Sequence, residues 1–316
     1  MSESSRNDTT SFGEQNSKYE EVKIPVPWGH ISGKWWGPKN IQPIITLHGR
    51  QDNAGSFDCL ISMMMMIRND IAFLCLDMPG HGFSSHLSVG QYYFVYWDGV
   101  FMLRRVVQHF QWSKITIIGH SLGGAIGFLY AASFPDEVEM LISLDIASPT
   151  NRNVSTMVKT TKDDIDRFFK YEQLKFDSVP SYGYDQMIDI VLDAYNGSIT
   201  RKSAEILMRR GMQPAEVPGK YYFSRDPRLK SSMLGMLSLD LTSEYARQIK
   251  CDYLNIRAVP GHKFDQPEHY QQMMNLIKKN ARRFEYHEVP GSHHVHLNEP
   301  EKVSPIILNF LKSGSI

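Results

Sequence analysis

Short apolar segments recur along the chain, and most of them end in a polar or glycine-containing turn. These segments are rich in Ile, Leu or Val and carry apolar residues on both faces. That composition is typical of strands buried on both sides in a parallel sheet. The pattern predicts strands at Ile41–Leu47, Asp70–Asp77, Ile115–Ile118, Val138–Leu144, Tyr253–Val259 and Arg283–Val289, preceded by a hairpin over Glu21–Trp36.

Helical segments with apolar residues along one side alternate with these strands. Such βαβα alternation predicts a mostly parallel sheet with helices on both faces. The expected helices are Ser56–Ile67, Gln91–Phe110, Leu122–Phe134, Pro267–Lys279 and Lys302–Leu311.

The pattern changes between residues 148 and 249, where helical stretches occur without a convincing buried strand. We therefore predict an α/β core formed by residues 19–147 and 250–316, a helical cap inserted at 148–249, and a disordered tail at 1–18. Helices are expected in the cap at Lys162–Phe176, Tyr184–Tyr195, Lys202–Arg210 and Asp226–Leu237.

Charge and cysteine content narrow the class of protein. Lys plus Arg and Asp plus Glu are equal at 34 each, so the formal net charge is zero. That balance argues against nucleic acid or an anionic membrane surface as the main partner. Three separated cysteines do not indicate a disulfide scaffold. The polar N-terminus, the lack of a long apolar run and the absence of a terminal Ser-Lys-Leu favour a cytoplasmic protein without a membrane span.

The strongest local signal for chemistry is the pentapeptide Gly119-His120-Ser121-Leu122-Gly123. It lies where an apolar strand gives way to a segment rich in small residues. A turn of this kind holds a serine in a strained conformation and exposes its hydroxyl at the start of a helix. Glycines two positions away on either side avoid collisions with the backbone. Ser121 is the predicted nucleophile.

Acyl transfer from such a serine produces an oxyanion, which preplaced donors must bind. The segment Leu47-His48-Gly49-Arg50 ends an earlier strand and is expected to face the turn at Ser121. The predicted oxyanion hole consists of the backbone N–H groups of Leu122 and Arg50.

A serine nucleophile also needs a neighbouring base. His293 follows the last predicted strand, at the sheet edge where open α/β sheets bind ligands. Three histidines, at 293, 294 and 296, could instead suggest zinc, but without a helix or nearby carboxylates this spacing is a weak metal signal. We predict His293 as the base, a structural role for His120, and no metal site.

The triad acid has two candidates in the chain order Ser…Asp…His. Asp265 lies in the loop after the strand that resumes beyond the insert, and Asp145 ends the strand just before it. We favour Asp265 and keep Asp145 as the alternative, since it could instead anchor a turn by binding backbone N–H groups. Asp77 precedes Ser121 and is interpreted as a turn-stabilising carboxylate.

Four blocks of sequence resemble the α/β-hydrolase superfamily and, more narrowly, the animal serine hydrolase-like (kraken-like) proteins. The resemblance implies a sheet of about eight strands with a helical cap over the active site. It also places the catalytic histidine seven residues before Pro300, at His293. Arg50 departs from the group, which usually has a bulky aromatic residue there. The blocks are LHGRQDNAGSF (47–57), DMPGHGFS (77–84), GHSLGG (119–124) and VPGSHHVHLNEP (289–300).

These residues together predict a serine hydrolase that cleaves carboxylic esters or thioesters through an acyl-enzyme. No cofactor is needed, and the expected partner is a small-molecule ester. The alternative is a hydrolase-like protein that binds a ligand with little turnover. Dehalogenases and epoxide hydrolases on this fold need an aspartate at the nucleophile position, which Ser121 excludes. The oligomeric state is not indicated.

Overall fold

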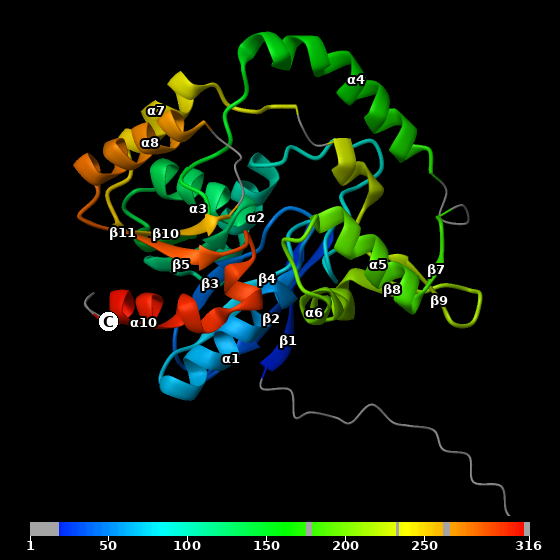
Figure 1. The fold of residues 1–316 in the computed structure, drawn as a ribbon, viewed down its shortest axis with the longest axis horizontal. Coiled ribbons are helices and arrows are strands. Elements are labelled where there is room, and N and C mark those ends of the chain that lie inside the picture. Colours follow the sequence, from blue (N-terminus) through cyan, green and yellow to red (C-terminus); the bar gives the residue numbers. More distant parts are fainter. Residues whose placement is uncertain (1–18, 175–178, 232–233, 262–265, 313–316) are drawn as a thin grey trace, which may run out of the picture.

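An eight-stranded sheet crosses the centre of the molecule in a computed structural model that describes residues 19–174, 179–231, 234–261 and 266–312 (Figure 1). The tail at 1–18, predicted to be disordered, lies outside the described residues. The strand order is β1-β2-β4-β3-β5-β6-β10-β11; β1, β2 and β4 pair antiparallel and the remaining neighbours pair parallel. The bounds are β1 Tyr19–Val26, β2 Gly29–Trp36, β3 Ile44–Leu47, β4 Phe73–Leu76, β5 Ile115–His120, β6 Val138–Leu144, β10 Asp252–Pro260 and β11 Arg283–Gly291.

Apolar residues on both sides of each central strand place it between two hydrophobic layers. In β10, Tyr253 packs into one layer, whereas Leu254 and Ile256 pack into the other. Successive side chains of a strand point to opposite faces, so a strand apolar at every position requires cover on both sides. The sheet and its register therefore follow from the pattern predicted above.

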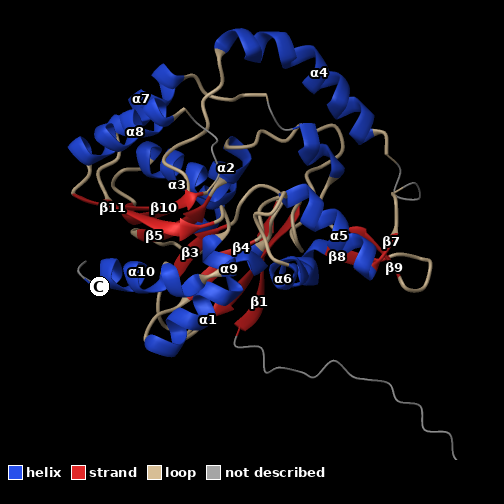
Figure 2. Cartoon of the chain, viewed as in Figure 1, coloured by secondary structure: helices blue, strands red, loops and turns tan. Residues whose placement is uncertain are grey.

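Helices supply that cover (Figure 2). One face carries α2, α3, α7 and α8, and the other carries α1 and α10. Helix α7 packs on α3 and α8 of the core although it falls within the predicted insert. No helix in the described part of the chain is long and apolar enough to span a bilayer. The bounds are α1 Asp58–Ile67, α2 Trp97–His109, α3 Leu122–Ser133, α7 Leu239–Arg247, α8 Pro267–Asn280, α9 Val295–Asn298 and α10 Ser304–Lys312.

The segment between β6 and α7 forms a lobe above the carboxyl edge of the sheet (Figure 1). It contains helices at three of the four expected places, together with a small antiparallel sheet of order β7-β9-β8, which was not predicted. The strands of this sheet are at most four residues long and only partly buried, so they lack a buried-strand signature. Where a helix was expected over Asp226–Leu237, the described residues form a 3-10 segment at Pro227–Ser231. The bounds are α4 Val154–Glu172, α5 Tyr184–Tyr195, α6 Arg201–Gly211, β7 Tyr182–Gly183, β8 Met212–Pro214 and β9 Lys220–Phe223.

A buried ion pair ties this lobe to the core. Arg210 at the end of α6 donates to Asp77 in the turn after β4, at 2.6 Å between Nη2 and Oδ2. Asp77 also accepts the backbone N–H groups of Ala54 and Phe83. The carboxylate therefore stabilises its turn, as expected, and also holds the end of α6 against the core.

Candidate active site

The turn between β5 and α3 places Ser121 in a conformation that few residues adopt. Its φ is 50° and its ψ is −118°, and it forms the N-cap of α3. A side chain at Gly119 would collide with the backbone of Gly123, and one at Gly123 would collide with the carbonyl group of Leu47. The glycine spacing of the motif thus has the steric cause proposed for it, and the strained serine is a feature of nucleophile turns.

His293 lies between β11 and α9 and contacts the carboxylate of Asp145, which follows β6. Its Nδ1 is 2.6 Å from Oδ2 of Asp145. The other oxygen, Oδ1, accepts the backbone N–H of Ala258 at 2.9 Å. A carboxylate only accepts, so His293 donates from Nδ1, and in the neutral ring Nε2 is the nitrogen without a proton.

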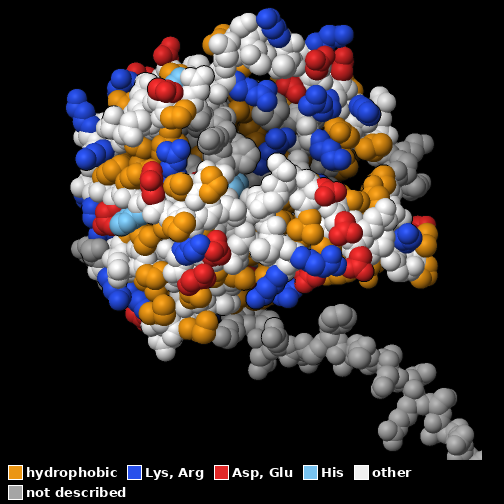
Figure 3. Space-filling view, viewed as in Figure 1, with side chains coloured by type: hydrophobic (Ala, Val, Ile, Leu, Met, Phe, Trp, Pro, Cys, Tyr) orange, Lys and Arg blue, Asp and Glu red, His pale blue; other side chains and the backbone are white. Residues whose placement is uncertain are grey.

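Ser121 and His293 line one cavity of about 640 Å³ between the sheet edge and the lobe. The lobe contributes residues of α5, including Tyr195, and Phe223 and Arg225 at the end of β9. Lysine and arginine side chains surround the hollow between α4 and α5 (Figure 3). The cavity size is within the usual range for small-molecule sites, about 300–1,000 Å³.

The two predicted oxyanion donors lie on either side of the serine. Leu122 is the first residue of α3, and the first N–H groups of a helix have no partner within it. Arg50 follows β3, and both residues line a small adjoining cavity of about 30 Å³. His48 braces this loop, because its Nδ1 is 2.7 Å from the carbonyl oxygen of Gly49 and its Nε2 accepts the N–H of Met78.

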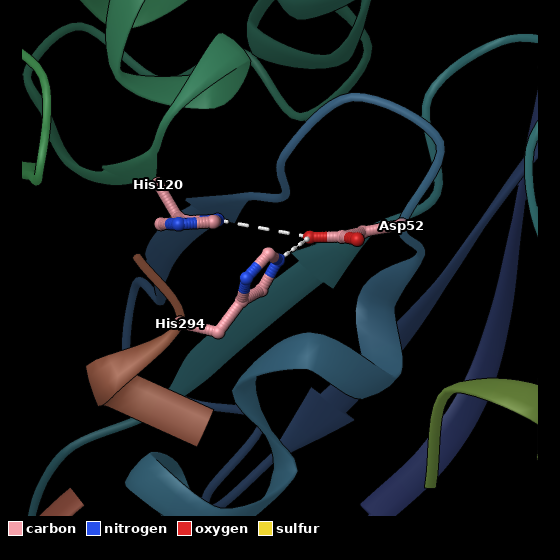
Figure 4. Close-up of side chains that lie close together, drawn as sticks. All are labelled: Asp52, His120 and His294. Carbon is pink, nitrogen blue, oxygen red and sulfur yellow. Dashed lines mark hydrogen bonds and ion pairs between the residues drawn. The ribbon is translucent and has the colours of Figure 1, made fainter. Parts of the chain in front are cut away.

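A second group of ionisable side chains lies beside the first, and its centre is Asp52 (Figure 4). Oδ2 of Asp52 is 3.3 Å from Nε2 of His294 and 3.7 Å from Nδ1 of His120. All three residues are buried. Burial opposes the ionised form of Asp52, but contacts with His294 and His120 outweigh it and hold the pKa of this carboxyl well below its usual range.

This second group was only partly anticipated. His120 was assigned a structural role, which its 2.9 Å hydrogen bond from Nε2 to the carbonyl oxygen of His293 supports. Asp52 was not recognised as a functional candidate. The signal available was its place directly after His48-Gly49-Arg50, in a loop that ends at the same sheet edge.

Comparisons with known proteins show the family to which this chain belongs. Residues 42–179 match the family model described as alpha/beta hydrolase fold. A "Probable serine hydrolase" of Drosophila melanogaster is 49% identical over 296 residues, which cover 94% of this chain and 88% of that protein. The chain belongs to the α/β-hydrolase family.

A human relative places this α/β hydrolase among the serine hydrolase-like proteins, and a solved bacterial structure shares its fold. "Serine hydrolase-like protein 2" of Homo sapiens is 32% identical, with 92% of this chain and 94% of that protein covered. The crystal structure of a hypothetical protein from Pseudomonas aeruginosa PAO1 superposes with a TM-score of 0.81 at 26% identity, covering 93% of this chain and 99% of the other. The predicted family and fold are confirmed.

The acid of this α/β hydrolase is the point where the structure and the sequence-based preference differ. The described carboxylate that meets His293 is that of Asp145, the alternative candidate. Asp265, the favoured one, lies outside the described residues. The turn role suggested for Asp145 also holds, because its φ is 52° and it binds the N–H of Ala258. The carboxylate of Asp145 thus binds both the His293 ring and a backbone N–H group, whereas the sequence argument treated these as alternatives.

Proposed function

We propose that this α/β hydrolase cleaves carboxylic esters or thioesters through an acyl-enzyme. Ser121 attacks the carbonyl carbon, and His293 takes the serine proton and then delivers it to the leaving group. Asp145 holds the imidazole in the required tautomer. The observation that carries the proposal is the joint position of a strained Ser121 and an Asp145-bound His293 on one cavity.

The backbone N–H groups of Leu122 and Arg50 are proposed to bind the oxyanion formed by that attack. The support for this assignment is their position. Leu122 begins α3 directly after Ser121, and Arg50 lies in the loop after β3 and lines the same cavity as Ser121. Loss of one such donor lowers turnover by about 10²–10³ in a studied enzyme.

The lining of the cavity favours an acyl or alcohol group that carries negative charge. Arg50 and Arg225 both line it, and none of its described lining residues is Asp or Glu. A guanidinium binds a carboxylate through paired donors. We expect esters with a free carboxylate to be preferred over neutral esters of equal length. Arg225→Gln should reduce that preference about tenfold in kcat/KM while leaving the neutral ester unchanged; an unchanged ratio would contradict this specificity.

The decisive test is covalent labelling by a fluorophosphonate probe, compared between the wild type and Ser121→Ala. Labelling of the wild type alone, with turnover of short aryl esters falling by about 10⁶ in the variant, supports the proposal. Circular dichroism shows that the variant is folded. A folded wild type that is neither labelled nor active would favour the alternative, a ligand-binding protein without turnover.

A further inference from the structure

Three ligand-type atoms converge beside the proposed triad without belonging to it. A carboxylate oxygen of Asp52, Nδ1 of His120 and Nε2 of His294 all lie within 4.8 Å of one another. Two of the separations are 3.3 Å and 3.7 Å. Ligands about 2.0–2.1 Å from a tetrahedral zinc ion are roughly 3.3–3.4 Å apart. Small side-chain movements would therefore close the group around one ion (Figure 4).

His120 has a buried nitrogen without a hydrogen-bond partner. Its Nε2 is 2.9 Å from the carbonyl oxygen of His293, which only accepts, so Nε2 carries the proton. In the neutral ring Nδ1 is then the unprotonated nitrogen, and the 3.7 Å that separates it from Oδ2 of Asp52 is too long for a hydrogen bond. A cation between these electron-rich atoms would satisfy both.

The surroundings hold the other two ligands in place. Nδ1 of His294 is 2.6 Å from the hydroxyl of Ser198, a contact of the kind that fixes the ring of a metal-bound histidine. Tyr195 donates to Oδ1 of Asp52, leaving Oδ2 directed at the histidines. A Cβ at Gly49 would lie 2.7 Å from Oδ2 of Asp52 and 2.8 Å from Nδ1 of His120. Glycine therefore keeps the space against both atoms open.

We propose that Asp52, His120 and His294 bind one divalent transition metal ion of the zinc type. Two imidazoles and one carboxylate are ligands that zinc accepts, and a water can complete the tetrahedron. An ion can enter from the active-site cavity, which His120 and His294 line.

The bound ion inhibits hydrolysis, a consequence that rests on the proposed function. The His293 ring lies 4.6 Å from that of His120 and 5.2 Å from that of His294, between ring centres. His293 must become an imidazolium when it takes the serine proton. Two additional positive charges at this distance disfavour that state. We expect one equivalent of zinc to reduce ester turnover tenfold or more, with recovery after chelation.

Cobalt provides a readout that does not depend on activity. Co²⁺ added to the metal-free full-length protein should give the intense visible absorption of four-coordinate Co²⁺, saturating at one equivalent. Zinc should abolish that absorption by displacement. Asp52→Asn and His294→Ala should each lower zinc affinity at least tenfold, as measured by competition with a chromophoric chelator. Ser121→Ala should bind cobalt like the wild type, so binding is tested even if the protein proves inactive.

His109→Ala is the matched control, because it removes an exposed histidine that belongs neither to the cluster nor to the lining of the cavity. It should bind zinc with wild-type affinity. Absence of four-coordinate cobalt absorption in the wild type would overturn the proposal, whether or not the variants fold. Equal zinc affinity in the wild type, a folded Asp52→Asn and a folded His294→Ala would overturn it as well. Cobalt binding without inhibition by zinc would remove the inhibitory consequence alone.

Discussion

Two carboxylate–histidine pairs lie side by side in this molecule, and adjacent residues supply their rings. His293 contacts Asp145 at 2.6 Å, whereas His294 contacts Asp52 at 3.3 Å. The ring of the first pair lines the cavity together with Ser121. The second has two rings near one carboxylate, and one of them leaves a nitrogen without a hydrogen-bond partner.

The comparison indicates that the directions of the two rings, and not their distance from each other, distinguish the role proposed for His293 from that proposed for His294. Residues 293 and 294 are consecutive, but their ring planes differ by 85°. One ring therefore presents a nitrogen to Asp145 and the other to Asp52. The short contact of the first pair suits a hydrogen bond that orients the ring, and the looser spacing of the second suits a bound ion.

Replacing His293 and His294 separately should give the largest difference in ester turnover. His293→Ala removes the proposed base and should lower ester turnover by about 10⁶, the loss seen for the equivalent histidine of a studied serine protease. His294→Ala should stay within about tenfold of the wild type, because His294 contacts no reacting atom in the proposed mechanism. Steady-state kinetics on metal-free protein separates the two. Losses of similar size would show that both rings belong to one catalytic unit.

The second largest difference in kcat is expected between variants of the two candidate acids, Asp145 and Asp265. Asp145→Asn preserves shape but favours the wrong tautomer of His293, and should lower kcat by about 10⁴. Asp265→Asn is the matched comparison, since the sequence argument favoured that residue, and it should leave kcat within about tenfold of the wild type. Kinetics with thermal melts of both variants decides the assignment. The opposite ranking would identify Asp265 as the acid.

The smallest effect on rate is expected at the other carboxylate. Asp52→Asn replaces the ionised group that meets His294, Tyr195 and His120. Removing a charge partner from a buried hydrogen-bonded group destabilises by about 1–3 kcal/mol. We therefore expect a lower melting temperature and a kcat within about tenfold of the wild type. Urea unfolding and kinetics on the same preparation test this; unchanged stability would mean that the Asp52 contacts contribute little.

Much of the fold was predictable because its determinants are local. Buried strands such as β5 and β10 need apolar residues on both faces, and that requirement is visible in sequence. The nucleophile turn was predictable for the same reason, since its glycine spacing relieves collisions within a few residues. The small sheet of the lobe was missed because β7, β8 and β9 are short and only partly buried.

The partners of Asp145 and Asp52 could not be predicted from local sequence patterns. Asp145 and Asp52 lie 148 and 242 residues from the histidines they meet. Nothing near either aspartate in the chain distinguishes a carboxylate that reaches a ring from one that only stabilises a turn. The metal signal at 293–296 was judged weak because its spacing came without a predicted helix or a nearby constellation of carboxylates.

By itself, the sequence determined the α/β core, the nucleophile turn and the choice of His293, because each depends on neighbouring residues or on strand order. Only the tertiary structure decided which carboxylate meets His293, and it alone brought Asp52, His120 and His294 together. The parallel sheet delivers the ends of β3, β5, β6 and β11 to one edge. The pairing there depends on the directions of side chains in turns.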